Sequence, residues 1–327
     1  MRIGIAILNW NGINLLKSHL KGVIDRSQDS TIYIIDNNSD DNSLEFVKQN
    51  FPQVKLISLD KNYGFAEGYN IGLKNVNEDI VCILNNDVEV TDKWLDPIKR
   101  ILKEKKNCII QPTIMDFNNR EYYEYAGASG GFIDKFGYPF CRGRIFYTIE
   151  KNKNQYSDDK IFWASGACMI IPKRTFYELG GFDKSFFAHM EEIDLCWRGF
   201  NKGIECFSST DSLVYHVGAA TLKENASKNY LNYRNSLIML TKNLPLNSLL
   251  YVLFIRIILD MISIIRYLII GRIDLSLSIV KAHLGYFNRA NKILRNRDKS
   301  LKKENYYRIR SIVYNYFISG KKKFFSL

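Results

Sequence analysis

The sequence predicts an α/β fold with a mostly parallel central sheet, followed by a helical and basic C-terminal extension. Short apolar runs rich in β-branched residues alternate with helix-like segments through the first 110 residues. These runs are apolar almost throughout, as in a parallel sheet that helices cover on both faces. Residues 221–327 carry 20 Lys and Arg against 5 acids, which leaves residues 1–220 at −3 of the total charge of +12. The extension therefore favours an anionic surface, either membrane or nucleic acid.

Length and composition indicate a globular protein. The chain has 327 residues, 46% of them hydrophobic, enough for one large domain or two ordinary ones. Its six cysteines form no C-x-x-C pair, and several lie in apolar runs, so a reducing compartment is expected. The N-terminus "MRIGIAILNWNG" has no small-residue cleavage site, which predicts a first strand rather than a signal peptide.

Four apolar runs predict the first strands: "RIGIAILNW", "STIYIIDNN", "VKLISLD" and "DIVCILNND". Each ends on polar residues, and the carboxyl ends of parallel strands form one rim where ligands bind. A dinucleotide site is disfavoured because "NWNGINLL" has one Gly where G-x-G-x-x-G is needed, although Asp36 ends the second strand where the ribose-binding acid of that motif would lie. The polar residues expected at the rim are Asn9, Trp10, Asn11, Asp36, Asn37, Asn38, Asp60, Asn62, Asn85, Asn86 and Asp87.

Asp87 ends the fourth run after two carboxamides, with Glu89 close behind. This pattern suits a hard divalent cation that keeps some waters and is completed by substrate phosphates. A strand-to-helix turn, in which Asp92 caps the helix "DKWLDPIKRILKEK", explains the spacing equally well.

An acidic cluster opens the helix "EEIDLCWRGFNKG", with Glu191, Glu192 and Asp194 in its first turn. Acids are common there because the helix dipole favours anions. The cluster also follows the aromatic run "FFAHM", and a carboxylate against aromatic rings has a raised pKa, which suits a general base near neutrality. Position alone leaves both interpretations open.

His216 lies in the alternating run "SLVYHVG". An ordinary half-buried histidine is the commoner explanation of such a position. A neutral imidazole beside a carboxylate is also a usual metal pair, and Mn²⁺ accepts this mixed ligation more readily than Mg²⁺.

Eight motifs in order give the chain a specific family resemblance. They are "AILNWNG", "IIDNNSDDNS", "NYGFAEGYNIG", "ILNNDVEV", "FWASGACMIIPKRTFYELGGFDKSFF", "EEIDLCWR", "LVYHVG" and "YLNYRNSL". Together they resemble glycosyltransferase family 2, which has the nucleotide-sugar-binding GT-A fold, and particularly its bacterial rhamnosyltransferase-type members that build cell-surface polysaccharides. The resemblance runs from about Ile3 to about Arg297.

The resemblance implies a set of donor-binding positions. They follow the first and second strands, occupy the loop that closes over the nucleotide sugar, and include the carboxamides before Asp87. The implied residues are Asn9, Asn11, Asp36, Asn38, Asn62, Gly64, Phe65, Gly68, Asn70, Asn85 and Asn86. Trp163, Ser165 and Gly166 are the implied acceptor-binding residues.

The resemblance also implies the catalytic groups. Asp87 matches the second acid of the D-x-D metal motif, while Asn85 replaces the first and removes one negative ligand. His216 matches a position that can complete the shell of a divalent cation, Mn²⁺ or Mg²⁺. In "EEIDL" the acceptor-activating base falls on Glu192, one methylene longer than the usual Asp, and Glu191 or Asp194 are alternative bases. The implied reaction is a single displacement with inversion at the anomeric carbon.

The segment 248–270 is long enough to span a bilayer, but it carries Arg256, Asp260 and Arg266. Arg256 and Asp260 are spaced as an i,i+4 ion pair on one stripe with Ser263 and Tyr267. We expect a helix in the membrane interface in preference to a core helix or a span. The tail beyond it mixes aromatic and basic residues, a composition that suits single-stranded nucleic acid, lipid headgroups or a solvated basic helix. The resemblance to glycosyltransferases, whose acceptors are often lipid-linked, favours the membrane surface.

The sequence therefore predicts a GT-A domain over 1–222, with a nucleotide-sugar half of about 1–110 and an acceptor half of about 111–222. Residues 223–327 form the membrane-associating region. The expected function is sugar transfer from a dTDP-rhamnose or UDP-hexose type donor to a hydroxyl of a cell-surface or lipid-linked glycan. We expect it at the cytoplasmic face, with a peripheral membrane contact and no nucleic acid, and the sequence indicates no oligomeric state. The alternative is a non-catalytic glycan-binding or scaffold protein on the same fold.

Overall fold

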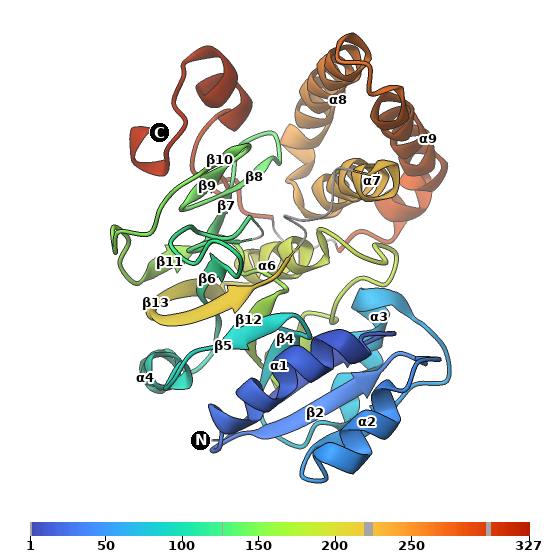
Figure 1. The fold of residues 1–327 in the computed structure, drawn as a ribbon. Coiled ribbons are helices and arrows are strands. Elements are labelled where there is room, and N and C mark those ends of the chain that lie inside the picture. The colour runs from blue at the N-terminus through green and yellow to red at the C-terminus, as the bar shows by residue number, and fades with distance from the viewer. Residues whose placement is uncertain (1, 126, 219–224, 299–301) are drawn as a thin grey trace.

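The architecture is that of a computed structural model, which describes residues 2–125, 127–218, 225–298 and 302–327 (Figure 1). The strands are β1 (Ile3–Asn9), β2 (Thr31–Asp36), β3 (Lys55–Ser58), β4 (Ile80–Asn85), β5 (Val88–Val90), β6 (Cys108–Asp116), β7 (Gly131–Ile133), β8 (Pro139–Cys141), β9 (Arg144–Ile145), β10 (Thr148–Ile149), β11 (Asp159–Ile161), β12 (Cys168–Pro172) and β13 (Glu205–His216). The α-helices are α1 (Ile13–Asp25), α2 (Ser43–Asn50), α3 (Gly64–Gly72), α4 (Leu95–Glu104), α5 (Lys173–Glu178), α6 (Glu191–Asn201), α7 (Ala226–Asn243), α8 (Leu246–Ile269) and α9 (Ile273–Arg295). Short helical turns cover Leu73–Asn75, Tyr314–Ile318 and Phe324–Ser326.

The central sheet has the strand order β11-β13-β6-β12-β4-β1-β2-β3, and β5 pairs with β13 at one side. The predicted parallel half is present, because β1 pairs in parallel with β2 and β4, and β2 with β3. The reversed strand β12 lies between β4 and β6, so the sheet is mixed beyond β4. β6 and β13 resume the parallel direction.

Helices cover both faces of this sheet, as continuous apolar strands require. Alternate residues of β1 show the two sides: Ile5 packs in a core with α1 and α4, while Ala6 packs in the other core with α3, α6 and α7. The second core extends into the helical extension, because it contains Trp197 of α6 and Leu237 of α7. The extension is therefore packed on the catalytic half and shares its core.

Two predicted domain boundaries can be compared with the structure. The division near residue 110 falls inside β6, in the middle of the sheet. The boundary between residues 222 and 223 lies outside the described residues. A separate antiparallel sheet, β10-β9-β8-β7, packs with the C-terminal segment, where the buried Asp134 accepts a hydrogen bond from the Ile312 amide at 2.9 Å.

In the extension, α9 packs against both α7 and α8 (Figure 1). The predicted ion pair of Arg256 and Asp260 is confirmed at 2.8 Å. Its orientation is the notable result, because both side chains are buried against the protein, at 4% and 0% exposure. The polar stripe of α8 thus faces inward, where Tyr138 and Ser236 supply partners, and its apolar side chains face outward.

Candidate functional site

The polar ends of β1, β2 and β4 meet at one rim, as their parallel pairing requires. Asn9 is fully buried, and its Nδ2 donates to Asp36 Oδ1 at 3.3 Å while its Oδ1 accepts from Asn86 Nδ2 at 3.1 Å. Asp36 also accepts two hydrogen bonds from Ser39, at 2.6 and 2.9 Å. Gly12 lies against this group, since an added Cβ would be 2.3 Å from Asn9 Oδ1.

Asn11 and Asn38 lie in the loops above Asn9 and Asp36. Both adopt left-handed backbone conformations, with φ of 49° and 61°. The Asn11 side chain accepts a hydrogen bond from the Asp40 amide at 2.9 Å, so it joins the β1 and β2 loops. Asn38 is exposed.

The loop from Asn62 to Phe65 is attached to β2 through Asn37. Asn37 Nδ2 donates to Asn62 Oδ1 at 2.9 Å and to the Gly64 carbonyl at 3.0 Å, and its Oδ1 accepts from the Tyr63 amide. Gly64 has a φ of 74°. An added Cβ there would be 2.7 Å from the ring of Phe187, so glycine is required by both conformation and space.

Gly68 and Asn70 have packing roles in this structure. Gly68 lets α3 approach β1, because an added Cβ would be 3.0 Å from Leu8. The Asn70 side chain donates to the Phe182 carbonyl at 2.7 Å and accepts from the Phe182 amide at 2.9 Å. Its amide group is thus used to join α3 to the segment before α6, rather than presented to a donor.

Asp87 and His216 are brought together from positions 129 residues apart in the sequence. Asp87 Oδ1 lies 3.1 Å from His216 Nε2, and Asp87 Oδ2 accepts from the Gly218 amide at 3.1 Å. Burial alone would raise the pKa of Asp87, but its hydrogen bond and charge interaction with His216 outweigh burial and lower it. Burial alone would lower the pKa of His216, but Asp87 and Glu124 raise it to about 10.

This pair fits a divalent cation. A carboxylate oxygen and an imidazole nitrogen are both common ligands of Mn²⁺, and Asp87 Oδ1 and His216 Nε2 lie close enough together, at 3.1 Å, to hold one cation. The Asn85 carboxamide lies 3.3 Å from the same imidazole nitrogen. Among the described residues no group of three His, Cys, Asp or Glu side chains forms a metal site. A cation here would therefore depend on further oxygen ligands, and His216 would have to release its Nε2 proton.

Glu124 is a site residue that sequence reasoning missed. It is 1% exposed, and its Oε2 lies 3.5 Å from His216 Nδ1, on the opposite side of the ring from Asp87. Such a contact fixes the ring of a metal-binding histidine. The available signal was an acid inside the aromatic stretch "YYEYAG".

The turn before β12, at residues 165–167, lies between the Asp87–His216 pair and the acidic N-terminus of α6. The Asn85 amide donates to the Ala167 carbonyl at 3.0 Å, so this turn lies beside the end of β4. On its other side, a Cβ added to Gly166 would be 3.3 Å from Phe65 and 3.9 Å from the Cβ of Glu192. Gly166 therefore lies between the donor loop and the acidic cluster.

The other two implied acceptor residues lie deeper. Ser165 is buried, and its amide donates to Gln111 Oε1 at 2.7 Å. Trp163 is 3% exposed, and its indole nitrogen donates to the Phe132 carbonyl at 2.9 Å. Its ring belongs to the core against Gly131.

Glu191 and Glu192 begin α6, where three residues before the helix have φ between 66° and 72°: Phe187, His189 and Met190. Burial, and then the neighbouring Glu192, raise the pKa of Glu191 well above its usual range. Burial also raises the pKa of Glu192 to about 7. Glu192 as a residue is half-buried, unlike Glu191 and Asp194, although its Oε2 is buried without a hydrogen-bond partner among the described residues.

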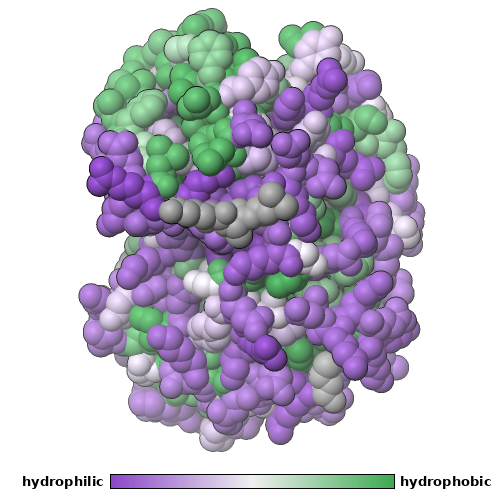
Figure 2. Space-filling view, turned by 180° about the vertical axis from the view of Figure 1, so that it is seen from behind, coloured by the Kyte–Doolittle hydropathy of each residue, from purple (hydrophilic) through white to green (hydrophobic). Residues whose placement is uncertain are grey.

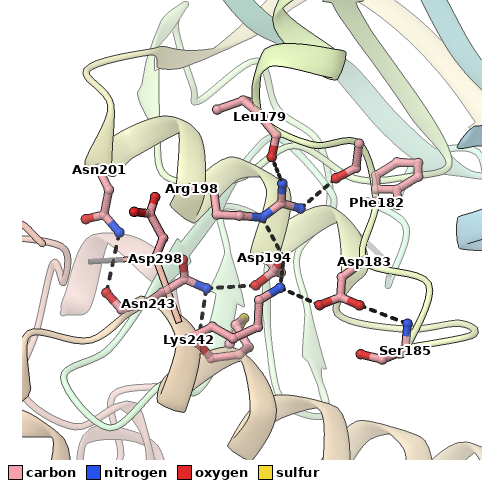
Figure 3. Close-up of polar contacts among 12 residues, drawn as sticks. Leu179, Phe182, Asp183, Ser185, Asp194, Arg198, Asn201, Lys242, Asn243 and Asp298 are labelled. Carbon is pink, nitrogen blue, oxygen red and sulfur yellow. Dashed lines mark hydrogen bonds and ion pairs between the residues drawn. The ribbon is translucent and has the colours of Figure 1, made fainter. Parts of the chain in front are cut away.

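Asp194 has a different environment (Figure 3). It accepts from Lys242 and Arg198, each at 2.8 Å, and from Asn243 at 2.8 Å. Burial would raise the pKa of Asp194, but the charges of Lys242 and Arg198 outweigh it and lower the pKa. Lys242 also pairs with Asp183 at 2.7 Å. Asp194 thus joins α6 to α7, and its lowered pKa suits an ion-pair partner better than a general base.

Comparisons with known proteins identify the family. The family model described as Glycosyl transferase family 2 matches residues 5–180. The hexosyltransferase Agl10 of low-salt glycan biosynthesis from Haloferax volcanii is 23% identical over 244 residues, covering 71% of this chain and 73% of its own. The N-acetylglucosaminyl-diphospho-decaprenol L-rhamnosyltransferase of Mycobacterium tuberculosis is 23% identical over 230 residues, covering 64% of this chain and 74% of its own.

Solved structures give the fold. The crystal structure of GalNAc-T7 with UDP, GalNAc and Mn²⁺ superposes with a TM-score of 0.60 at 17% identity, covering 74% of this chain and 48% of that chain. This chain thus spans about half the length of GalNAc-T7, and at this identity the likeness shows the GT-A fold alone. Because the family model covers more than half of the sequence, the chain belongs to glycosyl transferase family 2.

Proposed function

We propose that this protein is an inverting, cation-dependent glycosyltransferase. It moves one sugar from a nucleoside-diphosphate sugar of the dTDP-rhamnose or UDP-hexose type to a hydroxyl of a cell-surface or lipid-linked glycan. The lipid-linked acceptor is supported by the name of the mycobacterial relative, which acts on a diphospho-decaprenol sugar. The six cysteines are free and buried, which supports action in a reducing compartment at the cytoplasmic face of the membrane.

The observation that carries the proposal is the position of the Ser165–Ala167 turn. Ala167 contacts the end of β4 beside the Asp87–His216 pair, and Gly166 adjoins Glu192. Groups suited to a diphosphate and a group suited to a hydroxyl thus lie on either side of one turn. A single displacement needs this arrangement, because the acceptor attacks from the face opposite the leaving group.

Asp87 and His216 would hold the cation, with the Asn85 carboxamide beside them. When bound, the cation supplies Lewis acidity toward the diphosphate leaving group. Asn9 and Asp36 hold the floor of the donor site, and Asn37 positions the loop at Gly64 and Phe65 over it. Glu124 fixes the orientation of the His216 ring.

Glu192 is the proposed base. With a pKa of about 7, it is a carboxylate in a large share of molecules near neutrality and still basic enough to take a proton. The acceptor O–H proton passes to Glu192, the acceptor oxygen bonds to the anomeric carbon, and the bond from that carbon to the diphosphate oxygen breaks. Burial and the neighbouring Glu192 raise the pKa of Glu191 as well, and two such neighbouring carboxyls do not both ionise readily.

The test is a donor screen followed by product analysis. Purified protein is melted with UDP-, GDP- and dTDP-sugars, each with and without Mn²⁺. We expect one donor to raise the melting temperature in a Mn²⁺-dependent way. The same donor should give a product whose anomeric configuration, read by NMR, is opposite to that of the donor. Transfer that survives in both Asp87→Ala and Glu192→Ala would refute the enzymatic proposal.

A further inference from the structure

We propose that α8 and α9 dock the protein on a lipid bilayer that contains anionic lipid, with both helices lying in the plane of the membrane interface. The two helices form one end of the molecule (Figure 1), and that end carries a broad hydrophobic surface (Figure 2). Contiguous apolar surface of this extent on a protein marks an interaction site. The proposal concerns where the protein works and is independent of the reaction proposed above.

The outer face of α9 carries the clearest pattern. Ile273, Leu277, Val280, Leu284 and Phe287 are between 41% and 59% exposed. Their spacing of four, three, four and three residues places them on a single stripe of the helix. A surface helix of a globular domain needs one such stripe, which it turns toward the core.

The core-facing stripe of α9 is a second, separate one. Leu275, Ile279 and Ala282 are fully buried, and Tyr286 is 4% exposed. α9 is therefore apolar on two sides, and the protein covers one of them. The exposed apolar side of such a helix therefore needs a second apolar environment, outside the protein core.

α8 has the reverse of the arrangement found in soluble helices. Its buried ion pair faces the protein: Arg256 donates to Ser236 at 2.9 Å, and Asp260 lies 3.0 Å from His283. Its outward side chains are mostly apolar, with Leu250 and Ile269 each 80% exposed, and Arg266 is an exposed cation that donates to Tyr147 at 2.9 Å. Polar groups inside and apolar groups outside are typical of a helix whose outer surroundings are lipid.

The same contacts argue against a transmembrane span. α8, Leu246–Ile269, is the one helix among the described residues that is long and apolar enough to cross a bilayer, and 22% of its apolar window is buried. Crossing would remove Arg256 and Asp260 from their contacts on α7, α9 and the β7–β8 hairpin. An orientation in the plane keeps these contacts and immerses the outer face alone.

Charge identifies the lipid and disfavours a second copy as the occupant. Residues 246–298 contain eight Lys and Arg against three Asp. Lys281 and Lys292 are exposed and lie about 80° to 100° around α9 from Ile273, in the same direction, so both lysines border one edge of the stripe. Anionic headgroups complement this charge, whereas a second copy would bring two basic surfaces together.

Docking in this orientation would bring the acceptor side of the site to the membrane. α9 packs on α7, where Gly285 approaches Tyr230 so closely that an added Cβ would be 2.6 Å from its hydroxyl. α7 in turn holds the backbone before α6, since Arg234 donates to the Phe186 carbonyl at 3.2 Å. The membrane-facing helices are thus two packing steps from Glu191 and Glu192.

The first test is vesicle flotation of the full chain. We expect it to float with vesicles of phosphatidylcholine and phosphatidylglycerol, and at least tenfold less with phosphatidylcholine alone. Leu277→Ser/Leu284→Ser/Phe287→Ser should lose at least tenfold of the bound fraction. The control Tyr122→Ser/Tyr177→Ser removes exposed aromatic rings far from α8 and α9 in sequence and should float like the wild type. Circular-dichroism melts confirm that the variants are folded.

The second test measures how deeply α8 lies in the membrane. A spin label is placed at Leu250→Cys or Ile269→Cys, since the six native cysteines are buried and free of the label. Equal, shallow depths at both positions support the in-plane orientation, and labels at opposite surfaces would overturn it. Unchanged flotation of the triple variant would overturn the docking surface. So would a wild-type dimer in light scattering that becomes monomeric in the triple variant while neither protein floats.

Discussion

The side-chain nitrogen of Asn235 lies 2.8 Å from the carbonyl oxygen of His189. The same nitrogen lies 3.1 Å from the Phe186 carbonyl and 2.9 Å from the Ala188 carbonyl. Asn235 is fully buried on α7, so one amide holds three carbonyls of the backbone that leads into the acidic helix. Because non-glycine residues with positive φ cost about 1–3 kcal/mol each, this strained segment needs such support.

Asn235→Ala should therefore lower kcat while leaving donor binding intact. Without the amide, the backbone before α6 can relax and shift Glu192 relative to the acceptor. A displacement of about 1 Å costs on the order of 100-fold in rate. Steady-state kinetics with the donor found in the screen gives kcat, and calorimetric titration gives the donor dissociation constant.

Asn229→Ala is the matched control for this positioning role. Asn229 lies on the same helix, and its amide donates to the Leu275 carbonyl at 3.3 Å and to Ser278 at 2.9 Å, away from α6. It should lose stability without a specific loss of kcat. Equal losses of kcat in the two variants would show that Asn235 is merely structural. An acidic limb of the kcat/KM–pH profile that is identical in Asn235→Ala and in the wild type would show the same.

Glu192→Gln tests the base through the pH profile. The base acts as a carboxylate, so kcat/KM of the wild type should fall as the pH drops through about 7, the pKa to which burial raises Glu192. In Glu192→Gln the rate should fall by about 100- to 10,000-fold and the acidic limb should disappear. A limb retained in the variant would assign it to another group.

The same variant should be more stable than the wild type at high pH. The folded-state pKa of Glu192 lies above its ordinary value, so folding favours the protonated form. Near pH 4.5 Glu192 is largely protonated in the folded state, so burying its carboxyl group costs the folded protein little stability. Above pH 7 the wild type holds an ionised, partly desolvated carboxylate, which costs roughly 1–3 kcal/mol. Melting curves of Glu192→Gln and wild type should diverge between these pH values.

Asp194→Asn should have the opposite signature, namely lost stability with little change in the chemistry. Asp194 joins Lys242 and Arg198 between α6 and α7 (Figure 3). Removing one member of a buried ion pair costs about 3 kcal/mol at neutral pH. Because the folded-state pKa is lowered, the stabilisation is present above the unfolded pKa and is lost as the pH falls through the folded value. Urea titrations at pH 7 and pH 3 should show the variant's deficit shrinking at pH 3.

Asp92→Asn controls for removal of a carboxylate, because Asp92 forms an exposed ion pair with Arg26 at 2.9 Å. Its stability should change by less than about 1 kcal/mol at either pH. A deficit of Asp194→Asn no larger than this control would contradict the structural role assigned to Asp194.

The sequence predicts the polar rim of the sheet because this rim depends on a local sequence pattern. Each parallel strand ends on the polar residue that follows its apolar run, so the meeting of Asn9 and Asp36 requires only the strand pattern. The pairing of Asp87 with His216 came from the family resemblance, since no local pattern joins residues so far apart. Glu124 has no motif of its own, and only the path of the chain after β6 brings it to His216.

The acidic cluster shows why position alone cannot separate a base from a structural ion. Glu192 and Asp194 are two residues apart and share the helix N-terminus. Lys242, 48 residues further on, reaches Asp194 and lowers its pKa, while burial raises that of Glu192. The direction of α8 likewise depends on tertiary contacts, because Tyr138 and His283 draw the ion pair inward.

The last prediction concerns Asp87 and His216, and the surface acid Glu89 provides a matched control. Asp87→Ala and His216→Ala should each abolish the Mn²⁺-dependent part of the thermal shift that a nucleoside-diphosphate sugar produces. Glu89→Ala removes an acid two residues away that pairs with Arg120 at 2.8 Å at the surface, so its Mn²⁺-dependent shift should equal that of the wild type. The shift follows the ligand concentration relative to its dissociation constant, so a tenfold loss of affinity removes about 1.4 kcal/mol at saturation. If Asp87→Ala kept the full Mn²⁺-dependent shift, the cation would have to bind elsewhere, and the proposed leaving-group assistance at the end of β4 would be refuted.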